Sequence, residues 1–422
     1  MDVGRLHIFP IKNFHPVPPA LLGPGAHEMI GASASELGFR RTLLMTTGLR
    51  GTGIVEEIRA QVEAAGVEVI VFDRVQSNPK DSDVMAAHAV FRSERCDSFI
   101  SLGGGSSHDC TKATRVVAAH DGRLITDFKG PLALENPVLP PHIAVSTTAG
   151  TGSETSFAFV ITDTTSDPDK PHKFASFGHA VAPTMAIDDP VLFYSMPSDL
   201  TAFCGFDVLA HAVGAYVSVL EMTPSHGQAL QAIELLTTHL RPAVGNGYDA
   251  VAREGMMYAQ YIAGQAFNSA GLDAVHSISH ATSAHYDTHH GLGNAIATFP
   301  VWEANLPMAY RKFARIAQAM GVDTRGMSDV QAADAALMAT RRLADDVGIP
   351  HNFTSLNDLP RYSKSRIGEG RYAHAATIVG DDADCARIAL HALGDVCTVT
   401  NPRALTLDSM SALVKASMVG SR

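Results

Sequence analysis

Short apolar segments alternate with amphipathic segments along the first part of the chain. Runs such as TLLMTT and VEVIVFD have the length and β-branched content of buried strands, and the segments between them repeat with helical period. The pattern predicts strands at 42–47, 67–73, 97–102 and 142–147 and helices at 52–65, 82–95 and 107–119. This alternation is typical of βαβ units, so we expect a Rossmann-like parallel sheet with helices on both faces.

The pattern changes in the second half of the chain. A polar stretch at 162–171 predicts a hairpin or loop, and TMAIDDP predicts one more strand. From about residue 198 the periodicity is that of long helices, as in LTAFCGFDVLAHAVGAYVSVL. We therefore expect an α/β domain at 1–195 and an all-helical domain at 196–422.

Composition limits the kind of partner. A net charge of −11 argues against nucleic acid and anionic membranes, so a small molecule is the expected partner. The five cysteines are odd in number and form no CxxC pair, which favours a reducing cytoplasm over a disulfide framework. The first residues carry prolines and charges where a signal peptide is apolar. No other apolar segment reaches spanning length, so we expect neither export nor membrane insertion.

Two glycine-rich segments follow predicted strands. GGGSSHDCTK (103–112) opens a helix, where free N–H groups suit a phosphate, and STTAGTGSE (146–154) ends a strand at the same edge of the sheet. Together they indicate a nucleotide site. The alternatives are a tight connection in the first segment and turn-capping threonines in the second.

The end of the first predicted strand bears on which nucleotide binds. TLLMTTGLR places Thr46, Thr47 and Gly48 there, with Arg50 close behind, where dehydrogenases selective for NAD commonly carry an acid. A 2′-phosphate would meet no repulsion, which favours NADP over NAD. The alternative for Arg50 is an ordinary solvated arginine.

Histidines cluster in the predicted helical domain. Asp207 and His211 are four residues apart in a helical pattern, as are His276 and His280, and His290 follows just before two glycines. Three neutral imidazoles and one carboxylate suit Zn²⁺ or Fe²⁺ and leave room for a substrate oxygen. A hydrogen-bonded pair and a solvated histidine-rich helix end are the competing interpretations.

These motifs, in this order, resemble the nucleotide and metal motifs of the iron-containing (group III) alcohol dehydrogenases, which share a dehydroquinate synthase-like fold. The resemblance runs from about residue 15 to CTVTNPRALTLDSM and is strongest to the nitrosoaniline-dependent methanol dehydrogenases, through segments such as NFHPVPPALLGPGAHEMIG and REGMMYAQYIAGQAFNSAGL. In two places the chain departs from the family. Gly214 stands where a Glu often follows the second ligand, and Lys80 makes NPK of the usual NPT.

The resemblance implies a role for each matching residue. It implies Asp207, His211, His276 and His290 as metal ligands and His280 as a catalytic proton relay. It implies cofactor contacts from two sets of residues, with Lys112 ending the first motif. The first-motif set is Gly103, Gly104, Gly105, Ser106 and Asp109, and the second-motif set is Thr147, Thr148 and Thr151. Further expected cofactor contacts are Thr47 and Arg50, from the strand end, and Asn78, from NPK. His285 and His289 match no ligand position.

The function that follows is oxidation of methanol or another small primary alcohol to an aldehyde. One divalent metal, zinc or iron with magnesium as a further alternative, lowers the pKa of the alcohol, and hydride passes to a tightly bound NADP. The resemblance also implies a homo-oligomer, a decamer, and formaldehyde dismutation as a side activity, with the electron acceptor open. The competing classes are a metal-dependent lyase of the dehydroquinate synthase kind and a non-catalytic metal-binding protein.

Overall fold

A six-stranded parallel sheet forms the centre of the N-terminal region. The computed structural model describes residues 12–15, 17–167, 171–358 and 377–420. The strand order is β1-β9-β6-β4-β2-β3, and every neighbouring pair is parallel. The strands are β1 (Ala20–Leu22), β2 (Arg41–Thr46), β3 (Glu68–Phe72), β4 (Ser98–Gly103), β6 (His142–Ser146) and β9 (Met185–Asp188).

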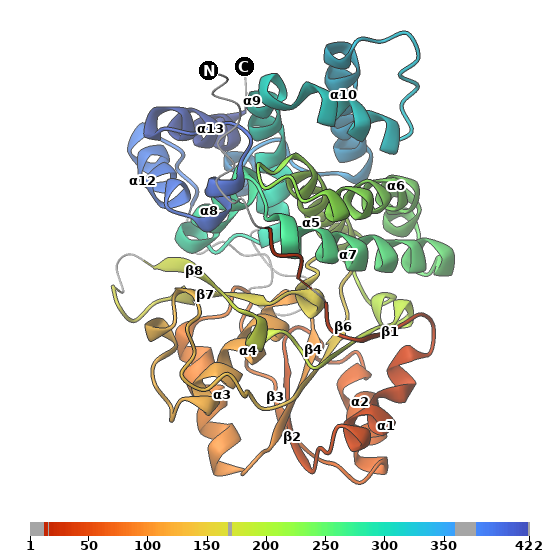
Figure 1. Ribbon diagram of the computed structural model, residues 1–422, viewed down its shortest axis with the longest axis vertical. Helices are drawn as coiled ribbons and strands as arrows, with labels where there is room; N and C mark the ends of the chain where they lie inside the picture. Colours follow the sequence, from red (N-terminus) through yellow and green to blue (C-terminus); the bar gives the residue numbers. More distant parts are fainter. Residues whose placement is uncertain (1–11, 16, 168–170, 359–376, 421–422) are drawn as a thin grey trace.

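Helices cover both faces of this sheet (Figure 1). They are α1 (Ile30–Glu36), α2 (Ile54–Ala64), α3 (Asp81–Ser93) and α4 (Gly105–Ala119). Successive strand side chains point to opposite faces, so Leu44 packs with the core under α1 and α2, whereas Leu43 and Met45 pack with that under α3 and α4. Strands buried on both sides explain the uninterrupted apolar runs in the sequence.

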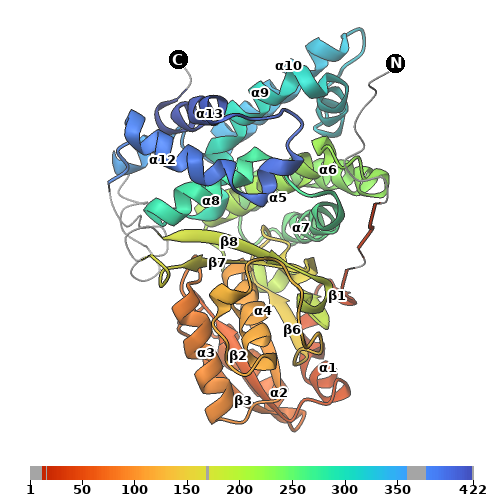
Figure 2. The same cartoon turned by 60° about the vertical axis from the view of Figure 1, so that its left-hand side comes forward.

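A small second sheet lies between the parallel sheet and the helices of the second half (Figure 2). Its order is β5-β8-β7, with β7 and β8 antiparallel. The strands are β5 (Gly130–Pro131), β7 (Ala158–Asp163) and β8 (His172–Phe177). The polar stretch at 162–171 is thus the connection of a hairpin, as expected, although residues 168–170 lie outside the described part.

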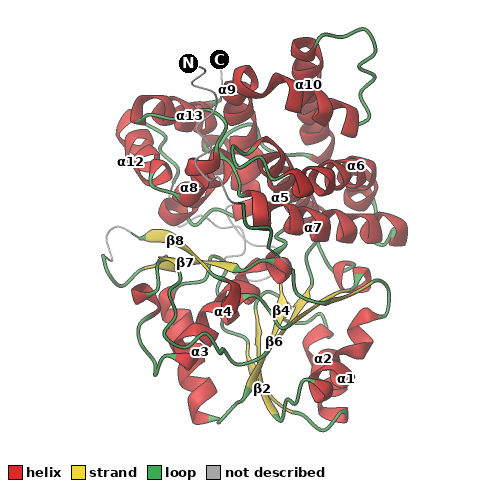
Figure 3. Ribbon diagram, viewed as in Figure 1, coloured by secondary structure: helices red, strands yellow, loops and turns green. Residues whose placement is uncertain are grey.

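Every described element after residue 197 is a helix (Figure 3). The longer ones are α5 (Ser198–Val217), α6 (Thr223–Gly245), α7 (Ala250–Ala270), α8 (Ala274–Tyr286), α9 (His290–Ala319), α10 (Asp329–Val347), α12 (Asp382–Leu393) and α13 (Leu407–Val419). Short 3-10 turns are η1 (Ala26–Met29), η2 (Ile125–Asp127), η3 (Ser153–Thr155), η4 (His179–Val181), η5 (Pro190–Phe193), η6 (Thr354–Asp358) and η7 (Val396–Thr400). The predicted class, a Rossmann-like α/β region followed by a helical one, is confirmed, while the division at 195 and 196 stays a prediction.

Two sequence expectations need correction. Strand β1 was not predicted, because three residues before a glycine turn carry too little periodicity to be recognised without their partner β9. The expectation that no apolar segment reaches spanning length is also wrong. By length and composition α5 could cross a membrane, but 100% of its apolar window is buried inside the protein. Packing against α6, α7 and α9 makes it the central helix of the helical region.

Candidate metal and nucleotide site

Four side chains from three helices converge on one point. Helix α5 contributes Asp207 and His211, α8 contributes His276, and α9 begins at His290. Asp207 Oδ1 lies 3.7, 3.8 and 3.6 Å from the Nε2 atoms of His211, His276 and His290. A tetrahedral ion with bonds of about 2.1 Å places its ligand atoms about 3.4 Å apart, so this set fits one divalent cation with little movement.

Burial keeps the three histidines in the neutral form that a metal needs. It lowers the pKa of His211 to about 3, and, with neighbouring imidazoles adding to the effect, it holds the pKa of His276 and His290 well below the ordinary value. Burial also raises the pKa of Asp207 to about 7, although Asn294 and Lys173 oppose this. A buried carboxylate surrounded by neutral imidazoles lacks a countercharge, and a cation would supply it.

Asn294 is a member of this cluster that the sequence did not reveal. Its amide Nδ2 lies 2.7 Å from Asp207 Oδ1 and 3.1 and 3.2 Å from Nε2 of His276 and His290. The amide therefore donates to the same atoms that would bind a cation. The only available signal was its position, one helical turn after His290, and asparagine in a helix is too common to be singled out.

Glycines let the helices approach closely at this point. A Cβ on Gly291 would lie 2.5 Å from the carbonyl oxygen of Phe203, so the first turn of α9 can rest on α5 only as glycine. A Cβ on Gly214 would lie 3.2 Å from the backbone nitrogen of Asp273. Glycine at 214, where the family often has Glu, thus lies in a tight contact with the start of α8. It has no side chain to reach the cluster.

His280 lies beside the cluster without belonging to it. Its ring stacks on that of His290, with centroids 5.0 Å apart and an interplanar angle of 14°. Its Nδ1 is 2.9 Å from Asp395 Oδ2. Burial tends to raise the pKa of Asp395, but the interaction with His280 and hydrogen bonds from Cys397 outweigh it and hold that pKa well below its usual range.

The two glycine-rich segments face each other at the carboxyl edge of the parallel sheet. A Cβ on Gly104 would lie 2.7 Å from Thr148 Oγ1, and one on Gly105 would lie 3.0 Å from Thr151 Cγ2. Helix α4 starts at Gly105, so its N-terminal N–H groups point into this cradle. Thr148 Oγ1 is buried without a hydrogen-bond partner. Glycine backbone, a helix N-terminus and an unpaired hydroxyl together fit a pyrophosphate.

The other residues expected to contact the cofactor here have additional roles. Asp109 accepts hydrogen bonds from Ser153 Oγ (2.6 Å) and from the backbone of Val160 (2.8 Å). Thr151 Oγ1 accepts from Ser153 N, which is the turn-capping alternative considered for the threonines. The ammonium of Lys112 is fully buried and donates to oxygens of Ser153, Ser156 and Ala158. Asp109 and Lys112 therefore bind the second segment to α4.

The second segment also joins the sheet to the helices. A Cβ on Gly150 would lie 2.7 Å from Cys204 Cβ on α5, and one on Gly152 would lie 2.9 Å from Gly264 Cα on α7. The backbone of Gly150 also donates to Gln260 Oε1. At this point the two halves of the chain touch through main chain, close to the cradle.

A pocket of about 240 Å³ continues from the ends of β2 and β3. Thr47 and Arg50, both expected from the sequence to contact the cofactor, line it. Asp73, which directly follows β3, lines it too, and its Oδ2 lies 3.0 Å from Arg50. The turn after β2 carries no acidic residue, as the sequence shows, but the pocket contains one, Asp73. The sequence pattern did not indicate Asp73, because the pairing of β2 with β3 that brings it beside Arg50 is visible only in the fold.

Asn78 connects three parts of the structure. Its Nδ2 donates to Asp287 Oδ1 (2.9 Å) and to the carbonyl of Thr288 (3.2 Å), and its Oδ1 accepts from Lys173 (2.7 Å). Lys173, which the sequence analysis did not select, is buried, and burial lowers its pKa to about 8. Its charge interacts with Asp109 of the cradle and Asp207 of the metal cluster. This cation therefore lies between the two halves of the site.

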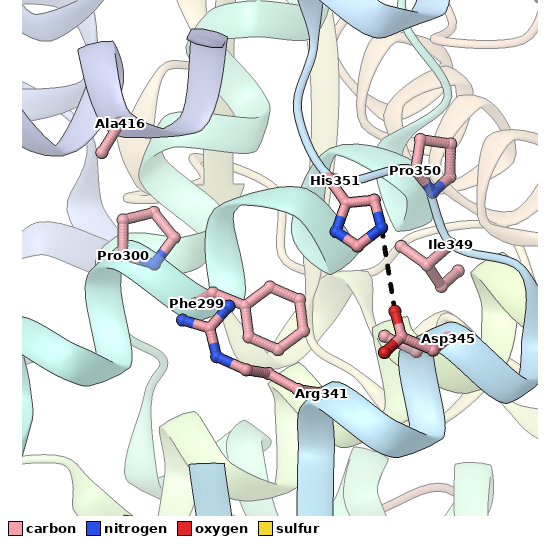
Figure 4. A pocket seen from close by; sticks show the side chains of 9 residues that line it. Phe299, Pro300, Arg341, Asp345, Ile349, Pro350, His351 and Ala416 are labelled. Atoms are coloured by element: carbon pink, nitrogen blue, oxygen red, sulfur yellow. Dashed lines mark ion pairs between the residues drawn. The ribbon is translucent and has the colours of Figure 1, made fainter. Parts of the chain in front are cut away.

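A second, smaller pocket of about 80 Å³ lies away from these residues, between α9, α10 and α13 (Figure 4). Arg341 lies over the ring of Phe299 at 4.8 Å, and His351 is 3.8 Å from Asp345. It contains none of the residues selected from the sequence. His285 and His289 likewise belong to no metal-type cluster among the described residues.

A nucleotide-type cradle beside a buried histidine and carboxylate cluster is the arrangement of a metal-dependent oxidoreductase. Residues 18–190 match the family described as iron-containing alcohol dehydrogenase, and residues 201–418 match its C-terminal part. The chain belongs to the iron-containing alcohol dehydrogenase family and is an alcohol dehydrogenase. The family binds a metal and a nicotinamide nucleotide, and the lyase alternative is not favoured.

Known relatives cover the whole length. Methanol:N,N-dimethyl-4-nitrosoaniline oxidoreductase of Amycolatopsis methanolica is 58% identical over 98% of this chain and 96% of its own. NAD-dependent methanol dehydrogenase of Bacillus methanolicus is 36% identical over 97% and 100%. The crystal structure of a 1,3-propanediol oxidoreductase superposes with a TM-score of 0.87 at 36% identity, over 97% and 100%. The resemblance identified from the sequence is confirmed.

Proposed function

We propose that this protein oxidises methanol and other small primary alcohols to aldehydes, using one divalent metal and a tightly bound NADP(H). Asp207, His211, His276 and His290 are the proposed metal ligands, with zinc or iron as the ion and magnesium as an alternative. The observation that carries the proposal is the placement of three Nε2 atoms within 3.8 Å of Asp207 Oδ1, inside a protein whose relatives act on methanol.

The chain's own groups have distinct tasks in this reaction. When bound, the divalent ion lowers the pKa of the alcohol hydroxyl and the nicotinamide accepts the hydride. Burial of the cluster excludes water from the reacting hydroxyl, and Asn294 holds the Asp207 carboxylate in place. His280, whose ring lies against that of His290, is the group placed to take up the hydroxyl proton and pass it towards solvent through water or ribose hydroxyls.

NADP(H) is proposed on two grounds. Arg50 lies in the adenosine pocket, where it can pair with a 2′-phosphate while remaining next to Asp73. The names of relatives at 54–58% identity specify a nitrosoaniline, not a soluble nucleotide, as the oxidant. An enzyme that keeps its nucleotide must reoxidise it in place with a second small molecule, and we propose that role for a nitroso compound or an aldehyde.

Aldehyde dismutation is a balanced extension of this scheme. One hydrated aldehyde gives hydride to the bound nucleotide and leaves as the acid, and a second aldehyde takes that hydride and a proton and leaves as the alcohol. No external oxidant is consumed. From the resemblance to the nitrosoaniline-dependent enzymes we further propose that the protein is a homo-oligomer, a decamer, which light scattering would test. The unpaired cysteines support the proposal that it is cytoplasmic.

The test combines elemental analysis with identification of the nucleotide released when purified protein is denatured. We expect about one divalent ion and about one NADP(H) per chain, and methanol oxidation with N,N-dimethyl-4-nitrosoaniline that does not depend on added nucleotide. A chain that releases no nucleotide and shows saturable dependence on added NAD or NADP would contradict the bound-cofactor proposal. Absence of a divalent ion from active protein would contradict the metal site.

A further inference from the structure

Asp395 has a fixed orientation next to His280. It immediately precedes η7, and its Oδ1 accepts a hydrogen bond from the backbone N–H of Cys397 at 2.8 Å. Ser277 Oγ lies 3.4 Å from the same oxygen. The remaining oxygen, Oδ2, is the one that meets His280 Nδ1 at 2.9 Å, and both side chains are more than nine-tenths buried. The backbone contact therefore determines which carboxylate oxygen faces the imidazole.

The imidazole of His280 is held from two directions. The carboxylate contacts its Nδ1 edge, and the ring of His290 stacks against its face. A carboxylate only accepts hydrogen bonds, so the nitrogen facing it must carry a proton. In a neutral imidazole the other nitrogen, Nε2, then has a free lone pair.

We propose that Asp395 is a positioning residue for catalysis, which fixes the Nδ1–H tautomer of His280 and leaves Nε2 as the atom that receives the alcohol proton. This inference rests on the proposed function, because it assigns the proton route of that reaction. Asp395 touches neither substrate nor cofactor in this scheme and acts only through His280.

A second metal site made of His280, Asp395 and Cys397 is the alternative use of these residues. Their potential ligand atoms all lie within 4.8 Å of one another. The hydrogen bonds argue against it, because Oδ1 and Oδ2 of Asp395 and Nδ1 of His280 already have partners. None of these atoms is among the buried polar atoms left without a partner in the described part of the chain.

The substitution Asp395→Asn separates tautomer control from simple packing. The backbone N–H of Cys397 requires an oxygen at the Oδ1 position, so the amide must turn its NH₂ towards His280. Nδ1 then has to accept, and the proton moves to Nε2. We expect kcat for methanol, with the nitrosoaniline acceptor, to fall on the order of 100-fold, with KM and the contents of metal and nucleotide unchanged.

A double variant tests whether Asp395 acts through His280. In a His280→Ala background, Asp395→Asn should cause no further loss of kcat, whereas a merely structural role would add to it. Asp384→Asn is the matched control, because Asp384 is a buried acid of the same region whose partners are Tyr286 and Arg387 and not the site. This control should keep full activity. Additive losses in the double variant would overturn the proposal.

Neutron diffraction supplies a readout that does not depend on turnover. We expect deuterium on Nδ1 of His280 in the wild type and on Nε2 in Asp395→Asn. The reverse placement in the wild type would refute the tautomer assignment whatever the activity, whereas failure of the wild type to oxidise any alcohol would refute the proposed function instead. A second equivalent of bound metal that disappears in Cys397→Ser would overturn the proposal in favour of the second metal site.

Discussion

The metal cluster and the glycine cradle are built by different means. The cluster consists of side chains, three imidazoles and a carboxylate, whose potential ligand atoms the helices bring within 4.8 Å of one another. The cradle consists of main chain and short hydroxyl side chains, and several polar residues near it are occupied in holding it together. The difference teaches that a metal site can be recognised in a sequence from the identity of its ligands. A nucleotide site made of backbone is recognisable only from its glycines, where side chains are absent.

The largest expected effect is on the metal side. His290→Ala removes one ligand from a buried set and should lower metal affinity by more than about 100-fold, with nearly complete loss of alcohol oxidation. His285→Ala, on the same stretch of chain but outside the cluster, is the control and should retain both. Metal analysis after dialysis measures the effect, and full occupancy in His290→Ala would break the assignment.

The next effect belongs to the cradle. Gly104→Ala places a Cβ 2.7 Å from Thr148 Oγ1, and overpacking of about 1–3 kcal/mol should weaken nucleotide retention by about tenfold or more. Metal content should not change, because no ligand is involved. Gly227→Ala is the matched control, since a Cβ there meets nothing within 4 Å. Equal loss of metal and nucleotide in Gly104→Ala would mean that the two regions do not act separately.

A smaller effect is expected at the adenosine pocket. Arg50→Ala should release NADP more readily while leaving thermal stability within about 1 kcal/mol, because its pair with Asp73 is exposed to solvent. Asp73→Asn should act in the opposite direction and improve NADP retention by removing the negative charge. Nucleotide retained through gel filtration is the measurement. If neither substitution changed retention, the adenosine end would have to bind elsewhere.

The smallest effect contrasts the metal-side histidines with His27, which lies on η1 in the N-terminal half of the chain. Burial keeps the metal-side imidazoles neutral, whereas at His27 hydrogen bonds to Asp189 and Glu57 outweigh burial and raise the pKa above its ordinary value of 6.5. A raised pKa stabilises the fold fully below pH 6.5, and that contribution is lost as pH rises through the folded-state pKa. Wild type should therefore exceed His27→Gln in thermal midpoint by more at pH 5.5 than at pH 8.5. An equal difference at both values would contradict this.

Residue type explains what the sequence could predict. The parallel strands were recognisable because successive residues such as Leu43 and Leu44, which face opposite sides of the sheet, are both apolar. The four proposed ligands were recognisable because histidine and aspartate are uncommon in buried helices. Asn294 escaped recognition because asparagine in a helix is too common to be singled out, and Asp395 and Lys173 because their partners lie 115 and 95 residues away in the chain. Asp73 needed knowledge of which strand lies beside β2. Pairings across such separations become visible only in the fold.

The close packing of Gly152 against Gly264 has a consequence for the residence time of a bound nucleotide. Side chains that block an exit can flip aside within nanoseconds, but two backbones packed too closely for a Cβ between them have no rotamers and separate only when whole segments shift. A nucleotide bound beside this contact would therefore dissociate only as fast as slow backbone motions allow. Small alcohols and aldehydes would enter and leave many times during one such event. The residence time of the cofactor would then be set by backbone packing, independently of the strength of its polar contacts.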